Sequence, residues 1–270
     1  MNIYSRLSKK YDDLYIENIL QFQKNMLGLK SQEYVDFYPV FGINQKERVE
    51  FIIYGQAVNG WRSQFKHLAD VNIEKSVAAS NEYIPGKINP LDWVNIQWSN
   101  SSLIEAIKDE EINCFIRKCN GNSDATYRTS KSFFWNVTYK LICDFYGLGR
   151  NSKEWSKKMV WSNLYKIAPD GSNPNSREIE AQKEISIELV KKEIEELKPK
   201  YCIFLTNQSW WHPFQEKLSS ENLNFDKSLL EIECYQEYLG VKIIVTKRPW
   251  RGNSDKFAAQ IIELIKMSEK

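Results

Sequence analysis

The chain has 270 residues, of which 42% are hydrophobic and 27% charged, and its 37 Lys and Arg nearly balance 35 Asp and Glu for a net charge of +2. A disordered chain needs fewer apolar residues and a larger net charge, and a histone-like coat for nucleic acid needs a strong basic excess. Both classes are therefore excluded, and the composition indicates a folded protein.

The first half of the chain predicts two helices and one strand. Apolar residues recur every three to four positions over 11–27, which predicts an amphipathic helix that ends before Gly28. The run V-E-F-I-I-Y at 49–54 is apolar, β-branched and aromatic, as is typical of a strand buried on both faces. A second helix is predicted over 130–146, with Thr129 or Ser130 as its N-cap and Gly147 as its end.

The second half alternates strands and helices. Short apolar runs predict strands at 159–164, 201–205 and 241–245. A long helix is predicted over 177–197, capped by Ser176, with glutamates that face solvent. A last helix is predicted over 254–267.

This alternation predicts an α/β fold, in which helices flank a mainly parallel sheet of four strands. Residues 62–125 have no clear period and are rich in Asn, Ser and Trp, so we expect them to form an insertion in a single domain spanning 1–270. Ligands of parallel sheets bind beyond the carboxyl ends of the strands. The segments that follow the four strands are unusually polar or aromatic, and they are 55–61, 163–166, 206–212 and 247–253.

The order and chemistry of these segments resemble the uracil-DNA glycosylase superfamily. The resemblance lies in a buried strand ending in G-Q, a second strand ending in W-S-N-L, a third of the type Y-C-I-F-L after a proline, and a last strand that leads into the basic loop K-R-P-W-R-G. It covers most of residues 48–265, in layout rather than in residue identity. It implies a three-layer α/β/α sandwich that binds a flipped base in DNA.

Carried over residue by residue, the resemblance implies a base-binding site and a basic rim. Asn163 would read the edge of the base and Arg248 would steady the departing base. The other implied base-binding residues are Gly55, Gln56, and Phe133 or Phe134 for stacking. Independently of the resemblance, the cluster of Lys247, Arg248 and Arg251 beside Trp250 suits phosphate contact with base stacking, so Lys247, Trp250 and Arg251 are expected to contact nucleic acid. No metal or cofactor is implied.

Two positions depart from the family pattern. Ala57 stands where many members have the carboxylate that positions or activates water, and Arg248 stands where a His is usual. Glycosidic cleavage needs a water-orienting group and a donor near the leaving base. Asn59 would orient the water and Arg248 would supply the donor, so hydrolysis of the N-glycosidic bond is one expectation.

Other interpretations stay open. The same fold with an inactive site would bind nucleic acid or a nucleotide without chemistry, and the crevice would also suit a small-molecule hydrolase or transferase. Each singled-out residue has a structural alternative as well: the glycines in a turn, Asn163 as a buried amide at the end of a strand, and Arg248 in a solvated loop. The partner is expected to be DNA, with RNA or a free nucleotide as alternatives.

Cysteine usage and local charge complete the expectations. The five cysteines are an odd number with no C-x-x-C pair, and no segment resembles a signal peptide or a membrane span, so we expect a cytoplasmic protein without membrane contact. Its two distant histidines predict no zinc site. The segments 126–170 and 241–256 together hold 13 Lys and Arg against 4 Asp and Glu, a local charge of +9 that leaves room for a DNA footprint.

Overall fold

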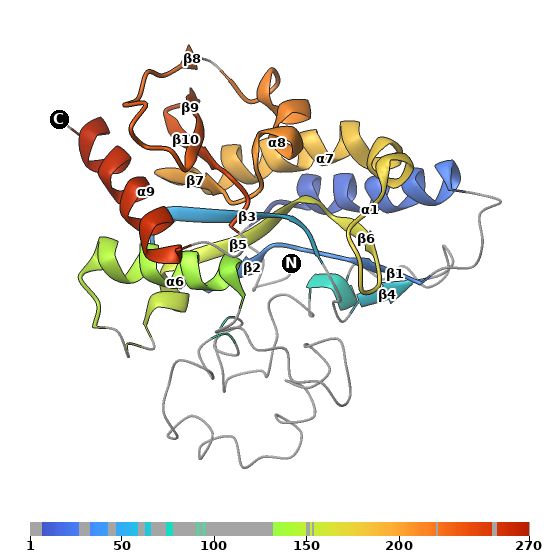
Figure 1. The fold of residues 1–270 in the computed structure, drawn as a ribbon. Coiled ribbons are helices and arrows are strands. Elements are labelled where there is room, and N and C mark those ends of the chain that lie inside the picture. Colours follow the sequence, from blue (N-terminus) through green and yellow to red (C-terminus); the bar gives the residue numbers. More distant parts are fainter. Residues whose placement is uncertain are drawn as a thin grey trace, which may run out of the picture.

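The computed structural model shows an α/β protein built on a seven-stranded mixed sheet (Figure 1). It describes residues 7–26, 33–42, 47–58, 63–65, 74–77, 91, 94, 132–149, 152, 154–219, 221–249 and 253–269. Most of the predicted insertion at 62–125 lies outside these residues, as do Asn59, Trp250 and Arg251.

The four predicted strands form the middle of the large sheet, and all four are parallel. They are β5 (Met159–Tyr165), β3 (Phe51–Ala57), β7 (Tyr201–Phe204) and β10 (Val241–Thr246), in that spatial order. Antiparallel strands extend both edges: β2 (Val40–Phe41) beside β5, and β9 (Ile232–Tyr238) followed by β8 (Glu221–Asn222) beside β10. The sheet is therefore wider than the predicted four strands.

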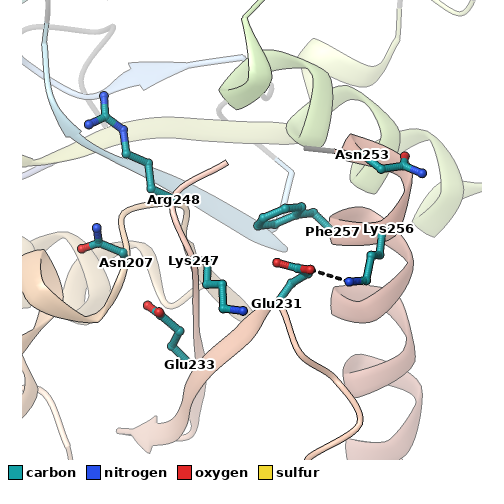
Figure 2. Close-up of a pocket in the computed structure, with 8 residues that line it drawn as sticks. All are labelled: Asn207, Glu231, Glu233, Lys247, Arg248, Asn253, Lys256 and Phe257. Carbon is teal, nitrogen blue, oxygen red and sulfur yellow. Dashed lines mark hydrogen bonds and ion pairs between the residues drawn. The ribbon is translucent and has the colours of Figure 1, made fainter. Parts of the chain in front are cut away.

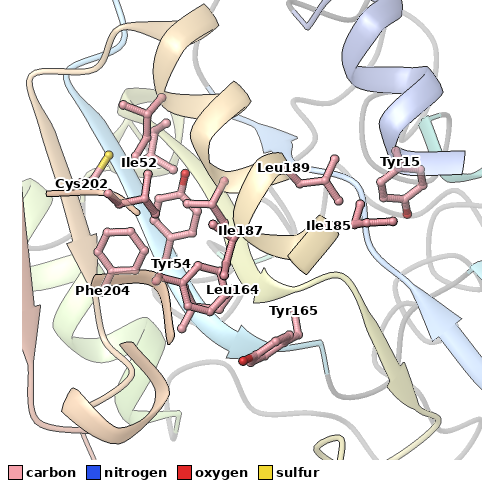
Figure 3. Close-up of a cluster of buried hydrophobic side chains, with 14 of the residues drawn as sticks. Tyr15, Ile52, Tyr54, Leu164, Tyr165, Ile185, Ile187, Leu189, Cys202 and Phe204 are labelled. Carbon is pink, nitrogen blue, oxygen red and sulfur yellow. The ribbon is translucent and has the colours of Figure 1, made fainter. Parts of the chain in front are cut away.

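Helices cover both faces of this sheet. Helices α1 (Lys9–Asn25) and α7 (Ser176–Leu197) lie on one face, and α6 (Phe133–Tyr146) and α9 (Ser254–Ser268) lie on the other (Figure 1). Figure 3 shows the first interface, where Ile187 of α7 faces Tyr54 and Leu164 of the sheet and Leu189 lies on the side of Tyr15 of α1. Burial of these apolar side chains on both faces is the main force that holds the layers together.

The remaining described elements are short. A second sheet has three antiparallel strands in the order β4 (Ser63–Phe65), β1 (Tyr34–Asp36) and β6 (Ile167–Pro169). A 3₁₀ helix, η3 (Trp155–Lys158), precedes β5, and helix α8 (Gln208–Gln215) follows β7. None of these pieces was predicted, and neither were β2, β8 and β9.

Two predicted helix starts are wrong by a few residues. Helix α6 is capped by Ser132, whose hydroxyl accepts from the Trp135 N–H, rather than by Thr129 or Ser130. Helix α7 is capped by Asn175 rather than Ser176, because Asn175 and Glu178 form a reciprocal capping box. Asn175 satisfies backbone N–H groups that Ser176, one position later, does not reach.

Strand alternation decides which side chains face each helical layer. In β3, Ile52 and Tyr54 belong to the core under α1 and α7, whereas Phe51 and Ile53 belong to the core under α6 and α9. The next residue of the second series is Gly55, which therefore faces α6. This alternation brings the end of β3 against the start of that helix.

Candidate functional site

Three predicted base-binding residues meet at the carboxyl ends of β3 and β5. Gly55 and Asn163 are directly paired in the parallel register of these strands. A Cβ atom placed on Gly55 would lie 2.5 Å from Oδ1 of Asn163 and 3.6 Å from Cε2 of Phe134. Because real Cβ atoms do not approach an oxygen so closely, only glycine allows the Asn163 amide to lie over this backbone.

Asn163 carries a buried hydrogen-bond donor that no described residue uses. The residue is 1% exposed, and its Nδ2 has no hydrogen-bond partner among the described residues. Leaving a buried amide donor unpaired costs about 1–3 kcal/mol. A bound ligand or an ordered water would supply the missing acceptor.

Phe134 is the aromatic residue that borders this amide. Its ring is partly exposed and lies 4.9 Å from the ring of Trp135 and 6.4 Å from that of Trp161. Phe133 precedes it by one helical position and so points about 100° away around α6. The structure thus places Phe134, rather than Phe133, beside Gly55.

Gln56 is buried, and its side chain is already engaged. Its Nε2 donates to the carbonyl oxygen of Thr206 at 2.8 Å, and its Oε1 accepts from Nδ2 of Asn173 at 3.3 Å. These bonds tie the end of β3 to the end of β7 and to the loop before α7. The Gln56 amide therefore braces the sheet edge rather than pointing freely toward a ligand.

A pocket of about 700 Å³ opens at the carboxyl end of β10 (Figure 2). Its lining residues come from the ends of β7 and β10, the start of β9 and the start of α9: Asn207, Glu231, Glu233, Lys247, Arg248, Asn253, Lys256 and Phe257. Lys247 and Arg248 are exposed, and neither has an ion-pair partner in the part of the chain that the structure describes. In Figure 2 the Arg248 side chain extends away from the Glu231–Lys256 pair.

The two carboxylates of this pocket already have partners. Glu231 pairs with Lys256 at 2.6 Å, and Glu233 accepts the backbone N–H of Gln208 at the start of α8. Glu231 and Lys256 offset each other, so Lys247 and Arg248 together with Glu233 leave the pocket lining with a net charge of +1. A cationic pocket with a buried Phe257 in its wall suits an anion such as phosphate better than it suits carboxylate-based hydrolysis.

Asn207 adds backbone strain at the same pocket. Its φ of 76° and ψ of 163° place it in a region that is almost restricted to glycine. It caps α8, and its Oδ1 accepts from the Trp210 N–H and the Ser209 hydroxyl. Strain of this kind concentrates at functional sites. The only sequence signal was its place in the polar segment that follows β7, because its backbone conformation depends on the surrounding structure.

The predicted site residues thus form two groups. Gly55, Phe134 and Asn163 make one group on β3, α6 and β5, and Lys247 and Arg248 make the other at the end of β10. Strand β7 lies between β3 and β10, and Arg248 does not share the pocket lining with Gly55 or Asn163. Lys140 of α6 bonds Ser254 at 3.0 Å and Asp255 at 2.7 Å, which ties the helix that carries Phe134 to α9, whose first turn lines the pocket of the second group.

Sequence reasoning missed a buried ion pair beside the first group. Lys166 and Glu193 are both fully buried, with Nζ and Oε1 2.6 Å apart. The interpretation of α7 as a helix whose glutamates all face solvent is therefore wrong, because Glu178 is buried as well. The signal was present: Glu193 lies four residues after Leu189 and four before Leu197, on the apolar stripe of the helix.

The described residues offer no other obvious reactive centre. Burial raises the pKa of the Cys202 thiol well above its usual value, and burial raises the pKa of Cys143 and of Cys234 to about 11. These thiols are therefore poor nucleophiles. Within the described ranges, no group of three or more His, Cys, Asp and Glu is arranged to hold a metal, and no helix is long and apolar enough to cross a membrane.

Comparison with known proteins found no relative from which a role could be taken. The sequence matches no protein-family model, and no curated protein matches it significantly. Any function must therefore be inferred from the geometry at the edge of the sheet.

Proposed function

We propose that this protein binds a nucleobase at the carboxyl edge of its sheet, in the manner of the uracil-DNA glycosylase superfamily. The observation that carries the proposal is the buried Nδ2 of Asn163, which has no hydrogen-bond partner among the described residues. It belongs to the amide whose Oδ1 lies over Gly55, near Phe134. An amide donor next to an aromatic ring offers both an edge contact and a stacking face for a planar base. The ligand atom that meets Nδ2 would be a hydrogen-bond acceptor.

The arrangement of the layers supports this assignment. Under the proposal the chain is a single three-layer α/β/α domain of the uracil-DNA glycosylase type, spanning 1–270 with an insertion at 62–125. The four parallel strands with helices on both faces fit that type. Parallel sheets of this kind bind ligands at the edge where Gly55 and Asn163 lie.

The cationic pocket supplies a second contact in this proposal. Lys247 and Arg248 would hold a DNA phosphate while the base occupies the group around Asn163, because a flipped nucleotide presents both at once. The hydrolytic form of the proposal requires Arg248 to turn from the phosphate toward the departing base, whose negative charge it would stabilise, and Asn59 to orient the attacking water.

A second candidate function is base binding without hydrolysis. Ala57 ends β3 and stands where a water-activating carboxylate would be expected, and a methyl group neither orients nor deprotonates water. The observation favours a recognition module that keeps the base contacts and lacks the general base.

The proposal is tested with duplex oligonucleotides containing uracil, hypoxanthine or a thymine mismatch. The enzyme form predicts abasic sites, detected by strand scission in alkali; the binding form predicts salt-sensitive binding without abasic sites. In both forms Asn163→Ala weakens binding of the modified duplex. Failure of the wild-type protein to bind or cleave any of these duplexes would overturn both candidate functions.

A further inference from the structure

A pair of opposite charges lies wholly inside the protein, next to the candidate base site. The Lys166 and Glu193 side chains are 0% exposed, and Nζ lies 2.6 Å from Oε1. Replacing a buried ion pair by neutral residues of similar shape often leaves a protein equally stable or makes it more stable. Stability alone therefore does not account for this pair, and its contacts indicate what else it does.

Glu193 anchors the pair to two other elements. The Tyr11 hydroxyl of α1 donates to its Oε1 at 2.6 Å, and the Ser162 hydroxyl of β5 donates to its Oε2 at 2.8 Å. With Lys166, these groups give the carboxylate three donors from different parts of the chain. Its position in the core is therefore closely fixed.

Lys166, which directly follows β5, is held by Glu193 and in turn holds the end of that strand. Besides Glu193, its Nζ donates to the Ser162 hydroxyl at 2.7 Å and to the backbone carbonyl of Asn163 at 2.6 Å. An ammonium group has three N–H donors, and all three are used here. The lysine side chain thus bends back over residues 162–166 and fixes the peptide that carries Asn163.

Helix α7 also holds the residue that follows. Gln182 accepts from the N–H of Ile167 at 3.0 Å and donates to the carbonyl of the same residue at 2.8 Å. Side chains alternate along a strand, so while Ser162 reaches toward α7, the Asn163 side chain leaves the opposite face and lies over Gly55. We call the contacts of Lys166, Glu193 and Gln182 with residues 162–167 the clamp. The clamp holds the Asn163 backbone from the face of the sheet opposite the Asn163 amide.

We propose that Lys166, held by Glu193, is a positioning residue that sets the orientation of the Asn163 amide toward the base. This inference rests on the proposed function for its consequence in binding, but the orientation of the amide can be measured separately. A displacement of about 1 Å in a ligating group can cost a hundredfold in activity, which is why such a clamp matters.

The test variant is Lys166→Met combined with Glu193→Gln. The introduced glutamine keeps an oxygen acceptor for the Tyr11 hydroxyl and offers an N–H donor to the Ser162 hydroxyl. Both charges disappear together, and the Asn163 carbonyl loses its donor. The matched control is Lys191→Met with Glu188→Gln, the same change at a surface pair of α7. The side-chain amide resonances of Asn163 are followed by NMR, with Asn163→Ala identifying them.

The inference predicts that the test variant stays folded, shifts the Asn163 side-chain resonances and binds the duplex preferred by the wild type about tenfold less tightly or worse. The control is expected to change neither property. Unchanged Asn163 resonances in the folded variant would overturn the inference, as would unchanged binding where Asn163→Ala loses it. If no duplex binds the wild type, the proposed function fails, while the resonances still decide whether Lys166 positions the amide.

A second variant covers the case in which the first does not fold. Lys166→Gln with Glu193→Gln places two neutral amides in the buried site, where they can bond each other and Ser162. Glutamine is shorter than the lysine it replaces, so the change is expected to release the Asn163 carbonyl and to produce the same shift of the Asn163 resonances. A folded protein with wild-type resonances would contradict the inference.

Discussion

Gly55 and Asn163 are register partners on adjacent parallel strands, and a Cβ on Gly55 would lie 2.5 Å from the Asn163 side-chain oxygen. The Asn163 amide thus occupies the space that a side chain at position 55 would fill. We therefore expect Gly55→Ala to displace the Asn163 amide, and to destabilise the fold by about 2 kcal/mol, as overpacking of a tight site does. Urea unfolding and duplex binding measure the two effects.

Gly149→Ala is the matched control for this change. A Cβ on Gly149 would meet no atom within 4 Å, and its φ lies outside the left-handed region. We expect it to alter stability by less than about 0.5 kcal/mol and to leave binding unchanged. Equal effects of the two substitutions would show that contact with Asn163 is not the cause.

Asn207→Gly is expected to make the protein more stable and its binding weaker. Glycine relieves about 1–3 kcal/mol of backbone strain. Two effects lower the stability in return. The weaker helix cap costs a few tenths of a kcal/mol, and the greater flexibility of the unfolded chain costs about 0.4–1 kcal/mol. The expected net gain is about 1 kcal/mol by urea unfolding, while the pocket loses the side-chain amide at its wall.

Leu239→Gly separates strain from binding. Leu239 has a φ of 52° in the turn between β9 and β10, and it does not line the pocket. The glycine is expected to relieve left-handed strain there as well, with duplex binding unchanged. Weaker binding in both variants, or in neither, would contradict a role for the Asn207 side chain.

The sequence was sufficient to predict the strands and helices that bury a whole apolar face. Strands β3, β5, β7 and β10 read as short apolar runs because both their faces are covered, and α7 and α9 show a helical period because one side of each is covered. Strand β9 was missed because I-E-C-Y-Q-E-Y mixes charged and apolar residues at a partly covered edge. Helix α8 was missed because eight residues with an internal Pro213 carry too short a pattern.

The candidate site was predictable only in part, for a physical reason. Gly55, Asn163 and Arg248 could be predicted because they lie at or just after the carboxyl ends of predicted strands. In a parallel sheet these ends all lie at the same edge, where ligands bind. Whether a particular amide is free depends on its neighbours: Gln56 is bonded to Thr206 and Asn173, whereas Asn163 Nδ2 is unpaired among the described residues. Those contacts join residues more than a hundred positions apart, and no local pattern encodes them.

Buried tyrosines predict a loss of stability in alkali. Burial and the neighbouring Glu178 raise the pKa of Tyr34 to about 12, and burial and Glu269 raise that of Tyr201 to about 12, from a usual value of 10. Between these values the folded state holds protons that the unfolded state has released, so stability falls as the pH rises from 10 toward 12. The stabilisation is fully present below pH 10.

The measurement is a pH titration followed by tyrosinate absorbance and circular dichroism together. We expect part of the tyrosinate signal to appear only as the helical signal is lost. Tyr201→Phe removes the hydroxyl that donates to Glu269 at 2.8 Å and should make the alkaline transition less steep. Complete ionisation of the tyrosines near pH 10 with the fold intact would show that their hydroxyls are not held as described.

The salt dependence of DNA binding tests the cationic pocket directly. Each phosphate contact made by a Lys or Arg releases counterions and contributes about 0.9 to the slope of log affinity against log salt concentration. Lys247 and Arg248 are exposed and have no ion-pair partner in the described ranges, so both are available for phosphate.

Lys247→Ala and Arg248→Ala should each lower the magnitude of the slope by about 1 and weaken binding to all duplexes alike. Lys183→Ala, at a surface pair of α7, is the control and should leave the slope unchanged. If removing Arg248 abolished discrimination between bases while the slope stayed constant, Arg248 would contact the base rather than the phosphate.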